Sequence, residues 1–358
     1  MVNQFTEPTE FVLTDGKIEK ILYAIVEINQ ECNLACPGCY MIQENKRDPK
    51  KLMTPEEVAI ILDVLKPKSL DILGGEPTLS PYFKSIVDVC VSKGVLPWIF
   101  TNMTMIDQST AKFLKDRGAY ITGKLNVGNP ELPEQKLIQA RMIGRNEGFV
   151  DKMLIGLNNL LDIGYRMPML SLENLLRKEN VGYAVEYTRW CFERDIRPDL
   201  EILSCARCDP KGIEEYFEKA PEVDQIKKIV GELQKIYNDY GIDWSILPPH
   251  ISGGGICRFK DNGIYFSKKD DGVYMQPCSA NTTELGKFIG KESVKMALEN
   301  PVMIVRRRLI EAYKKGMIEG QCGDCSYFIE KGCKGGCRAT AENLYGLYGS
   351  YPLCWMVK

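Results

Sequence analysis

Cysteine is the residue that most constrains this chain. The sequence of 358 residues holds 14 cysteines and a single histidine, His250. Its N-terminus is polar and acidic and carries no secretory signal pattern, so we expect a cytoplasmic setting in which the thiols stay reduced. Reduced cysteines at close spacing are soft thiolate ligands that select iron–sulfur clusters or zinc. The single histidine also disfavours a Ser-His-Asp or Cys-His centre.

The overall composition is that of an ordinary globular protein and excludes several function classes. Hydrophobic residues make up 44% and charged residues 26%, which excludes disorder as the main content. The 46 basic and 48 acidic residues nearly cancel, which disfavours nucleic acid or a membrane surface as a partner. No apolar run approaches the roughly 20 residues that span a bilayer.

Strand-like and helix-like segments alternate through the first two-thirds of the chain. We expect strands over 21–28, 69–73, 95–101, 120–125, 167–171 and 199–203. Helical patterns lie between and after them, over 55–66, 81–93, 107–117, 148–163, 181–194 and 213–240. Repeated βα units predict an α/β fold with a parallel sheet, here a partial or full barrel. The active site of such a sheet lies at the C-terminal ends of the strands.

A cluster of proline and glycine over 247–255 predicts a domain boundary. We therefore expect an N-terminal segment over 1–20, a barrel over 21–245 and a second domain over 246–358. The second domain is loop-rich, and it holds seven of the 14 cysteines. Because about 100 loop-rich residues bury little core, metal clusters would hold this domain together.

Two motifs follow the first two expected strands. The first is a C-x3-C-x2-C run of Cys32, Cys36 and Cys39. Three thiolates on a four-iron cluster leave one iron open to a small molecule, which is a catalytic arrangement; zinc with a fourth ligand from elsewhere is the alternative. The second motif is Gly-Gly-Glu at 74–76, where glycines let the backbone approach a ligand and the carboxylate can bind an ammonium group.

Together these motifs resemble those of the radical SAM superfamily, over residues 21–203. The resemblance implies a partial (β/α)6 TIM-like barrel in which Cys32, Cys36 and Cys39 ligate a 4Fe–4S cluster whose unique iron binds S-adenosylmethionine (SAM). It implies that one electron from the reduced cluster cleaves SAM into methionine and a 5′-deoxyadenosyl radical, which abstracts hydrogen from the substrate. The residues that it implies around SAM are Tyr40 against the adenine, Gly74, Gly75 and Glu76 at the amino group, Thr101 and Asn102 after the third strand, and Lys124 and Asn126 after the fourth. For the last four, ordinary polar strand ends are the alternative.

The C-terminal cysteines resemble those of the SPASM extension, which follows many radical SAM barrels and binds two auxiliary 4Fe–4S clusters. By that resemblance, an outer cluster would be held by Cys322, Cys325, Cys333 and Cys354, and an inner one by Cys257, Cys278 and Cys337. The chain departs from the family pattern in three ways. The Cys325–Cys333 spacing is two residues longer than usual, and Gly272 lies one residue further from Cys278. No cysteine stands a few residues before Cys257.

The fourth ligand of the inner cluster is therefore open. His250, one of Cys205 and Cys208, or an iron left free for substrate would each complete the site. Cys205 and Cys208 also follow the last expected strand, at the mouth of the barrel, so either thiol is a candidate catalytic hydrogen-atom donor to a product radical. Incidental thiols in a loop are the alternative for these two, and a turn residue is the alternative for His250.

The sequence thus predicts a radical SAM oxidoreductase or maturase of the SPASM subgroup, acting on a peptide or a small natural product by oxidation, crosslinking or epimerisation. Expected partners are a flavodoxin or ferredoxin as reductant and a separate peptide-recognition protein, because only about 20 residues precede the first expected strand. Three alternatives stay open. They are a sugar or aminoglycoside dehydrogenase or epimerase of the same superfamily, an iron–sulfur electron carrier, and a zinc-bound interaction module.

Overall fold

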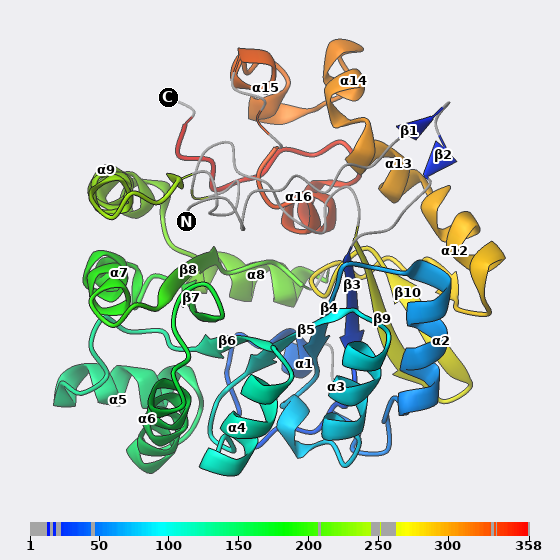
Figure 1. The fold of residues 1–358 in the computed structure, drawn as a ribbon. Helices are drawn as coiled ribbons and strands as arrows, with labels where there is room; N and C mark the ends of the chain where they lie inside the picture. The colour runs from blue at the N-terminus through cyan, green and yellow to red at the C-terminus, as the bar shows by residue number, and fades with distance from the viewer. Residues whose placement is uncertain are drawn as a thin grey trace.

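The structure is a computed structural model that describes residues 13–14, 17–18, 23–43, 47–206, 209–244, 251, 263–330, 333 and 335–356. A nine-stranded sheet forms the centre of this described part, with helices around it (Figure 1). The strands of that sheet, in spatial order, are β11 (Gly286–Lys287), β10 (Gly272–Gln276), β9 (Gly263–Lys269), β3 (Tyr23–Glu27), β4 (Ser69–Leu73), β5 (Leu96–Thr101), β6 (Tyr120–Lys124), β7 (Leu170–Leu176) and β8 (Arg197–Ile202). A separate hairpin pairs β1 (Leu13–Thr14) with β2 (Lys17–Ile18).

Six neighbouring strands, β3 to β8, run parallel and follow each other in chain order. They are apolar at most positions because a parallel sheet is covered on both faces; β4, for example, buries four of its five residues. A helix follows each strand, which confirms the expected α/β class with a partial (β/α)6 barrel. Parallel strands bring their C-terminal ends to one edge, so the loops after β3, β4, β5 and β6 lie together.

Helices cover the outside of the barrel and return the chain to the next strand (Figure 1). The α2 helix begins at Pro55 because Thr54 caps it. The Thr54 hydroxyl accepts from the Glu57 amide at 3.3 Å, and the Glu57 carboxylate accepts from the Thr54 amide at 3.0 Å. The helical segments of the barrel are α1 (Tyr40–Gln43), α2 (Pro55–Leu65), η1 (Pro77–Leu79), α3 (Phe83–Ser92), α4 (Gln108–Asp116), α5 (Pro133–Met142), α6 (Glu147–Asp162), η2 (Val181–Tyr183), α7 (Ala184–Phe192), α8 (Pro210–Lys219) and α9 (Val223–Asp239).

The C-terminal segment adds to the same sheet. β9 lies parallel to β3, with Tyr265 opposite Ile25, and β10 returns antiparallel to β9. The expected domain boundary at residue 246 lies outside the described residues. Short helices joined by loops follow, and Figure 1 shows α15 and α16 at one end of the molecule, away from α4 and α6. These helical segments are α12 (Lys291–Leu298), α13 (Pro301–Arg307), α14 (Leu309–Lys314), η4 (Gly320–Cys322), α15 (Tyr327–Glu330) and α16 (Arg338–Tyr345).

Three of the differences from the sequence-based expectation have a clear physical reason. β7 begins at Leu170 rather than 167, because Leu170 is the first residue paired with β6. The helix expected over 213–240 is two helices, since Pro221 lacks the amide hydrogen that would continue α8. The α5 helix was not expected, because its buried face uses the polar residues Gln135 and Gln139. Within the described residues, every helix is too short or too polar to cross a bilayer.

Candidate functional site

The loop of Cys32, Cys36 and Cys39 lies directly after β3, at the C-terminal edge of the sheet. A turn joins the last two cysteines, with the Cys39 amide donating to the Cys36 carbonyl at 3.0 Å. The Leu34 amide donates to the Cys32 sulfur at 3.4 Å, as amides do to a thiolate ligand. All three thiols are free and partly buried. The structure therefore offers three unpaired sulfur ligands at one edge of the barrel.

Burial and nearby cations act in opposite directions on the thiols of this loop. The pKa of Cys32 is raised to about 12, mainly by burial and in part by the nearby Glu76 carboxylate, while the hydrogen bond from the Leu34 amide opposes the rise. Burial also raises the pKa of Cys36, and the positive charges of Lys124 and Arg177 oppose that shift. Cationic side chains of this kind stabilise a negatively charged metal–thiolate centre, so the charges around the loop fit an iron–sulfur group.

An amide network that the sequence reading missed fixes the loop to the end of β5. The Asn102 side chain donates to the Asn33 side-chain oxygen at 2.8 Å and lies 4.0 Å from the Cys32 sulfur. Its own oxygen accepts from the Thr104 hydroxyl at 2.6 Å, and Asn33 donates back to that hydroxyl at 2.8 Å. Asn102 was expected near the cofactor. The sequence offered one signal for Asn33 and Thr104. Asn33 directly follows Cys32, and Thr104 lies just after the strand that ends at Thr101.

The Gly-Gly-Glu run lies against the segment that enters the cysteine loop. The Gly75 amide donates to the Asn29 carbonyl at 2.9 Å, and the Glu76 amide donates to the Glu31 carbonyl at 2.7 Å. A Cβ atom on Gly75 would lie only 2.0 Å from the Glu31 oxygen, and one on Gly74 would lie 2.2 Å from the Asn29 side-chain oxygen. Glycine is therefore required here by close backbone approach rather than by an unusual dihedral angle.

The Glu76 carboxylate is fully buried and accepts four hydrogen bonds. They come from the Thr78 amide and hydroxyl at 3.2 and 2.6 Å, the Thr101 hydroxyl at 2.7 Å and the Asn102 amide at 2.7 Å. Burial raises the pKa of this carboxyl, and the four donors oppose the shift. The contacts in the structure thus use Glu76 and Thr101 to join the ends of β4 and β5. The expected contact of the Glu76 carboxylate with an ammonium group stays a prediction.

Tyr40 connects the cysteine loop to the C-terminal segment. Its hydroxyl lies 3.3 Å from the hydroxyl of Tyr265 on β9, and Tyr265 in turn donates to the Glu27 carboxylate at the end of β3. Glu27 also accepts from the Gln30 side chain at 2.8 Å. Both Glu27 and Tyr265 are buried, and the sequence reading missed both. The expected adenine-facing residue is thereby held in place by a strand that lies more than 200 residues later in the chain.

Lys124 and Asn126 lie where the fourth parallel strand ends, as expected. Lys124 forms an ion pair with Glu173 of β7, and both side chains are partly exposed at this edge of the sheet. The Asn126 side chain is buried, and its oxygen accepts from the Leu175 amide at 3.0 Å. Lys124 is therefore the more accessible of the two for a ligand.

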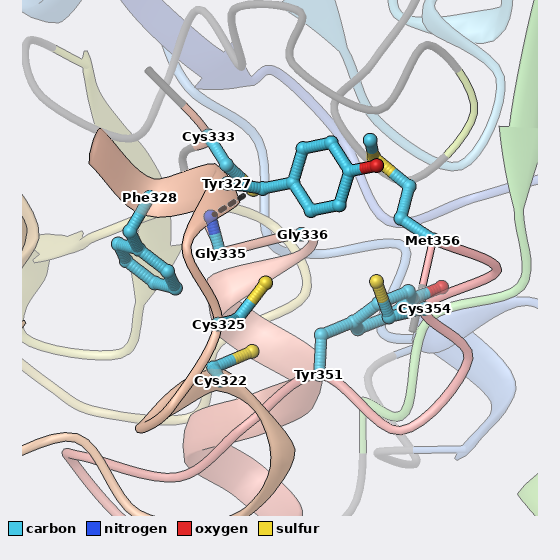
Figure 2. A pocket seen from close by; sticks show the side chains of 10 residues that line it. All are labelled: Cys322, Cys325, Tyr327, Phe328, Cys333, Gly335, Gly336, Tyr351, Cys354 and Met356. Carbon is cyan, nitrogen blue, oxygen red and sulfur yellow. Dashed lines mark hydrogen bonds between the residues drawn. The ribbon is translucent and has the colours of Figure 1, made fainter. Parts of the chain in front are cut away.

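Four C-terminal cysteines, Cys322, Cys325, Cys333 and Cys354, line one cavity (Figure 2). The Gly335 amide donates to the Cys333 sulfur at 3.4 Å. The rest of the lining is mostly aromatic or apolar and includes Tyr327, Phe328 and Tyr351 (Figure 2). The structure thus brings together the four residues expected around the outer cluster, and the donor set of four thiols in apolar surroundings fits such a group.

The inner set is described in part. The sulfur of Cys278 lies 3.9 Å from the Arg306 guanidinium, and that of Cys337, at the start of α16, lies 3.7 Å from the Ser204 hydroxyl. Cys205 is buried against the same helix, where its amide donates to Thr340 at 3.1 Å. The other candidates, Cys208, His250 and Cys257, lie outside the described residues.

The spacing of the side chains that the structure describes bears on whether they could hold a single metal ion. Among the residues that the structure describes, no three cysteine, histidine or carboxylate side chains come close enough to hold one ion directly. A polynuclear cluster spans more space than a single zinc ion, whose four ligands sit about 2.0–2.3 Å from the metal.

Comparisons with known proteins find similarity over much of this chain. Residues 26–191, a little under half of the chain, match the family model of the Radical SAM superfamily. A stretch of 156 residues is 30% identical to the Fe-coproporphyrin III synthase of Methanosarcina barkeri, covering 43% of this chain and 37% of that protein. The mycofactocin maturase MftC of Mycobacterium tuberculosis is 22% identical over 325 residues, which cover 88% of this chain and 77% of the maturase.

Solved structures share the fold over nearly the whole chain. SuiB of Streptococcus suis, bound to the precursor peptide SuiA, is 17% identical with a TM-score of 0.67, and the match covers 94% of this chain and 76% of SuiB. The enzyme anSMEcpe with bound AdoMet is 17% identical with a TM-score of 0.67, and the match covers 93% of this chain and 94% of anSMEcpe. These likenesses support the partial barrel and its C-terminal extension as one fold.

Proposed function

We propose that this chain is a radical SAM enzyme that cleaves SAM and abstracts hydrogen from a peptide or a small natural product. The observation that carries the proposal is the meeting of two motifs at one edge of the sheet, the loop of Cys32, Cys36 and Cys39 and the Gly-Gly-Glu run at 74–76. The three thiols would hold a 4Fe–4S cluster. When bound and reduced, that cluster supplies the electron that splits SAM into methionine and a 5′-deoxyadenosyl radical.

The chain's own residues would bind and orient the cofactor. The 74–76 backbone is fixed by hydrogen bonds to the segment before the cysteine loop, and its remaining carbonyl groups suit an ammonium group. Lys124 is an accessible cation for a carboxylate or a ribose hydroxyl. Tyr40, held by Tyr265, would lie against the adenine. Holding all parts of SAM excludes water and keeps the reacting carbon close to its target.

The C-terminal cysteines would hold auxiliary clusters that relay electrons, as in the SPASM subgroup. The cavity of Cys322, Cys325, Cys333 and Cys354 supports an outer cluster in apolar surroundings. Cys278 and Cys337, with Cys257, would hold an inner one. An electron acceptor beside the barrel permits a net two-electron oxidation or crosslink after hydrogen abstraction. The enzyme would take its electrons from a flavodoxin or ferredoxin.

A peptide is the substrate class that the fold likeness favours, because SuiB was solved with the precursor peptide SuiA, and anSMEcpe with AdoMet and a peptide. A separate recognition protein would then deliver the peptide. A small molecule is the second candidate, and the 30% identity with Fe-coproporphyrin III synthase over 156 residues favours it. If the product is an epimer, we propose Cys205 or Cys208 as the hydrogen-atom donor.

Anaerobic reconstitution followed by reduction with dithionite tests the proposal. We expect about 12 irons per chain for three 4Fe–4S clusters, and release of 5′-deoxyadenosine from SAM. A variant with Cys32, Cys36 and Cys39 all changed to alanine should lose about four irons and all SAM cleavage. As a control, Cys90→Ala, which changes a buried thiol in α3, should keep both properties.

Other outcomes separate the alternatives. Iron uptake without SAM cleavage would indicate an electron carrier, and zinc in place of iron would indicate an interaction module. With candidate peptides, a product lighter by two hydrogens indicates oxidation or a crosslink. An unchanged mass with deuterium gained from solvent indicates epimerisation.

A further inference from the structure

Arg177, which immediately follows β7, packs under the cysteine loop. Its side chain is only 5% exposed. A Cβ atom built on Gly38 would lie 2.6 Å from the Arg177 Nη2 atom and 2.9 Å from its Cζ atom. The guanidinium therefore occupies the space that a side chain at position 38 would take. Because Gly38 lies between Cys36 and Cys39, this cation sits directly against the turn that carries two of the three thiols.

The positive charge of Arg177 is poorly compensated by the protein around it. Nη1 contacts the Glu179 carboxylate at 3.3 Å, but that side chain is 47% exposed. Nε is buried and has no hydrogen-bond partner among the described residues. Burying a charge is costly unless it is paired and hydrogen-bonded. A negatively charged group beside the cysteine loop would therefore stabilise the buried guanidinium of Arg177.

The other cations near the loop are more exposed than Arg177. Lys124 is paired with Glu173, and the half-buried Arg47 donates to the Leu34 carbonyl at 2.6 Å, although its Nε has no hydrogen-bond partner among the described residues. Arg145 is exposed and donates to the Asn33 carbonyl at 2.7 Å. Arg177 is therefore the most buried of these four cations.

We propose that Arg177 is the buried counter-charge of the iron–sulfur cluster at Cys32, Cys36 and Cys39, and that it sets the potential at which this cluster accepts its electron. Reduction adds one electron from an external donor and breaks no bond, so the centre gains one negative charge. A buried cation stabilises that extra charge, and net charge and hydrogen bonds to the sulfur atoms are the known determinants of such potentials. The inference rests on the proposed function.

The test is a redox titration of the reconstituted full chain, followed by electron paramagnetic resonance. Subtracting the spectrum of the variant with alanine at Cys32, Cys36 and Cys39 isolates the signal of this one cluster. Arg177→Gln should lower the equilibrium constant for its reduction at least tenfold, which is about 59 mV for one electron. Arg177→Lys keeps the positive charge and should change the equilibrium constant for reduction less than tenfold. Arg145→Gln removes a charge from the exposed side of the same loop and should also have less than a tenfold effect, because water screens it.

Each outcome decides one of two questions. An Arg177→Gln chain that keeps its iron and the wild-type potential overturns the inference and leaves the proposed function standing. If the Arg177→Gln variant fails to take up the iron, the Arg177→Lys variant is the test. A cluster potential in Arg177→Lys near that of the wild type supports the counter-charge role. A tenfold or larger decrease in its equilibrium constant for reduction overturns that role. A wild-type chain that holds no iron at these three cysteines overturns the proposed function instead.

Discussion

Replacing Gly75 with alanine tests whether close backbone approach builds the candidate SAM site. The added Cβ atom would lie 2.0 Å from the Glu31 carbonyl oxygen, whereas ordinary contact begins near 3.4 Å. The two segments must therefore separate by more than about 1 Å, because the contact is with backbone and no side chain can rotate away. That shift breaks the Gly75–Asn29 and Glu76–Glu31 hydrogen bonds, which are 2.9 and 2.7 Å long.

The magnitude follows from these contacts. Two backbone hydrogen bonds contribute about 1–3 kcal/mol together, and the strain of overpacking adds about 1–3 kcal/mol. The smaller entropy of an unfolded chain with alanine offsets about 0.4–1 kcal/mol. The free energy of local opening around residues 73–78 should thus fall by about 1–5 kcal/mol. Even the lower limit predicts amide exchange roughly fivefold faster in that segment.

Hydrogen–deuterium exchange on the reconstituted chain measures this effect. Gly231→Ala is the matched control, because Gly231 lies inside α9 and a Cβ atom added there would meet no other atom within 4 Å. Alanine at that position should stabilise the helix by about 1 kcal/mol. Unchanged exchange over 73–78 in Gly75→Ala would refute the reasoning. Equal effects of Gly75→Ala and Gly231→Ala on exchange over 73–78 would also refute it, because only the Cβ atom added at Gly75 meets a neighbouring backbone.

Two further predictions concern buried polar contacts. Thr101→Val removes a hydroxyl that donates to the Glu76 carboxylate at 2.7 Å, so the free energy of unfolding in urea should fall by about 1.5–3 kcal/mol; a fall below about 0.5 kcal/mol would show that the carboxylate does not depend on this donor. Arg306→Met breaks an almost fully buried ion pair with Glu342 and should destabilise the chain by about 3–5 kcal/mol in the same measurement. The double variant with Glu342→Leu should recover much of that loss, and a double variant weaker than the single one would contradict this account.

Much of the barrel is predictable from the sequence because its signals are local. The 69–73 strand has the bounds that its sequence pattern predicts, and the helices that follow Thr54 and Asp107 begin within one residue of the expected positions. The elements that the sequence did not predict depend on contacts with other parts of the chain. The start of β7 depends on its pairing with β6, and β9 joins the sheet beside β3 although the two are more than 200 residues apart.

The candidate sites divide in the same way. The cysteine spacing and the Gly-Gly-Glu run identified the candidate ligand-binding segments, because neighbouring residues on one loop stay close in any fold. Neither spacing nor periodicity pointed to Tyr265 behind Tyr40, since the two are 225 residues apart.

The sequence by itself determined the parallel βα order of this protein and the three-thiol loop. The resemblance of its C-terminal cysteines to the SPASM extension grouped the four that line one cavity. Only the tertiary structure decided that the Glu76 carboxylate joins the ends of β4 and β5, and that the Arg177 guanidinium fills the space beside Gly38. The physical reason is that strand propensity and thiol spacing arise from local side-chain patterns. The partner of a buried charge, in contrast, is set by which distant segments the packed sheet brings to the same edge.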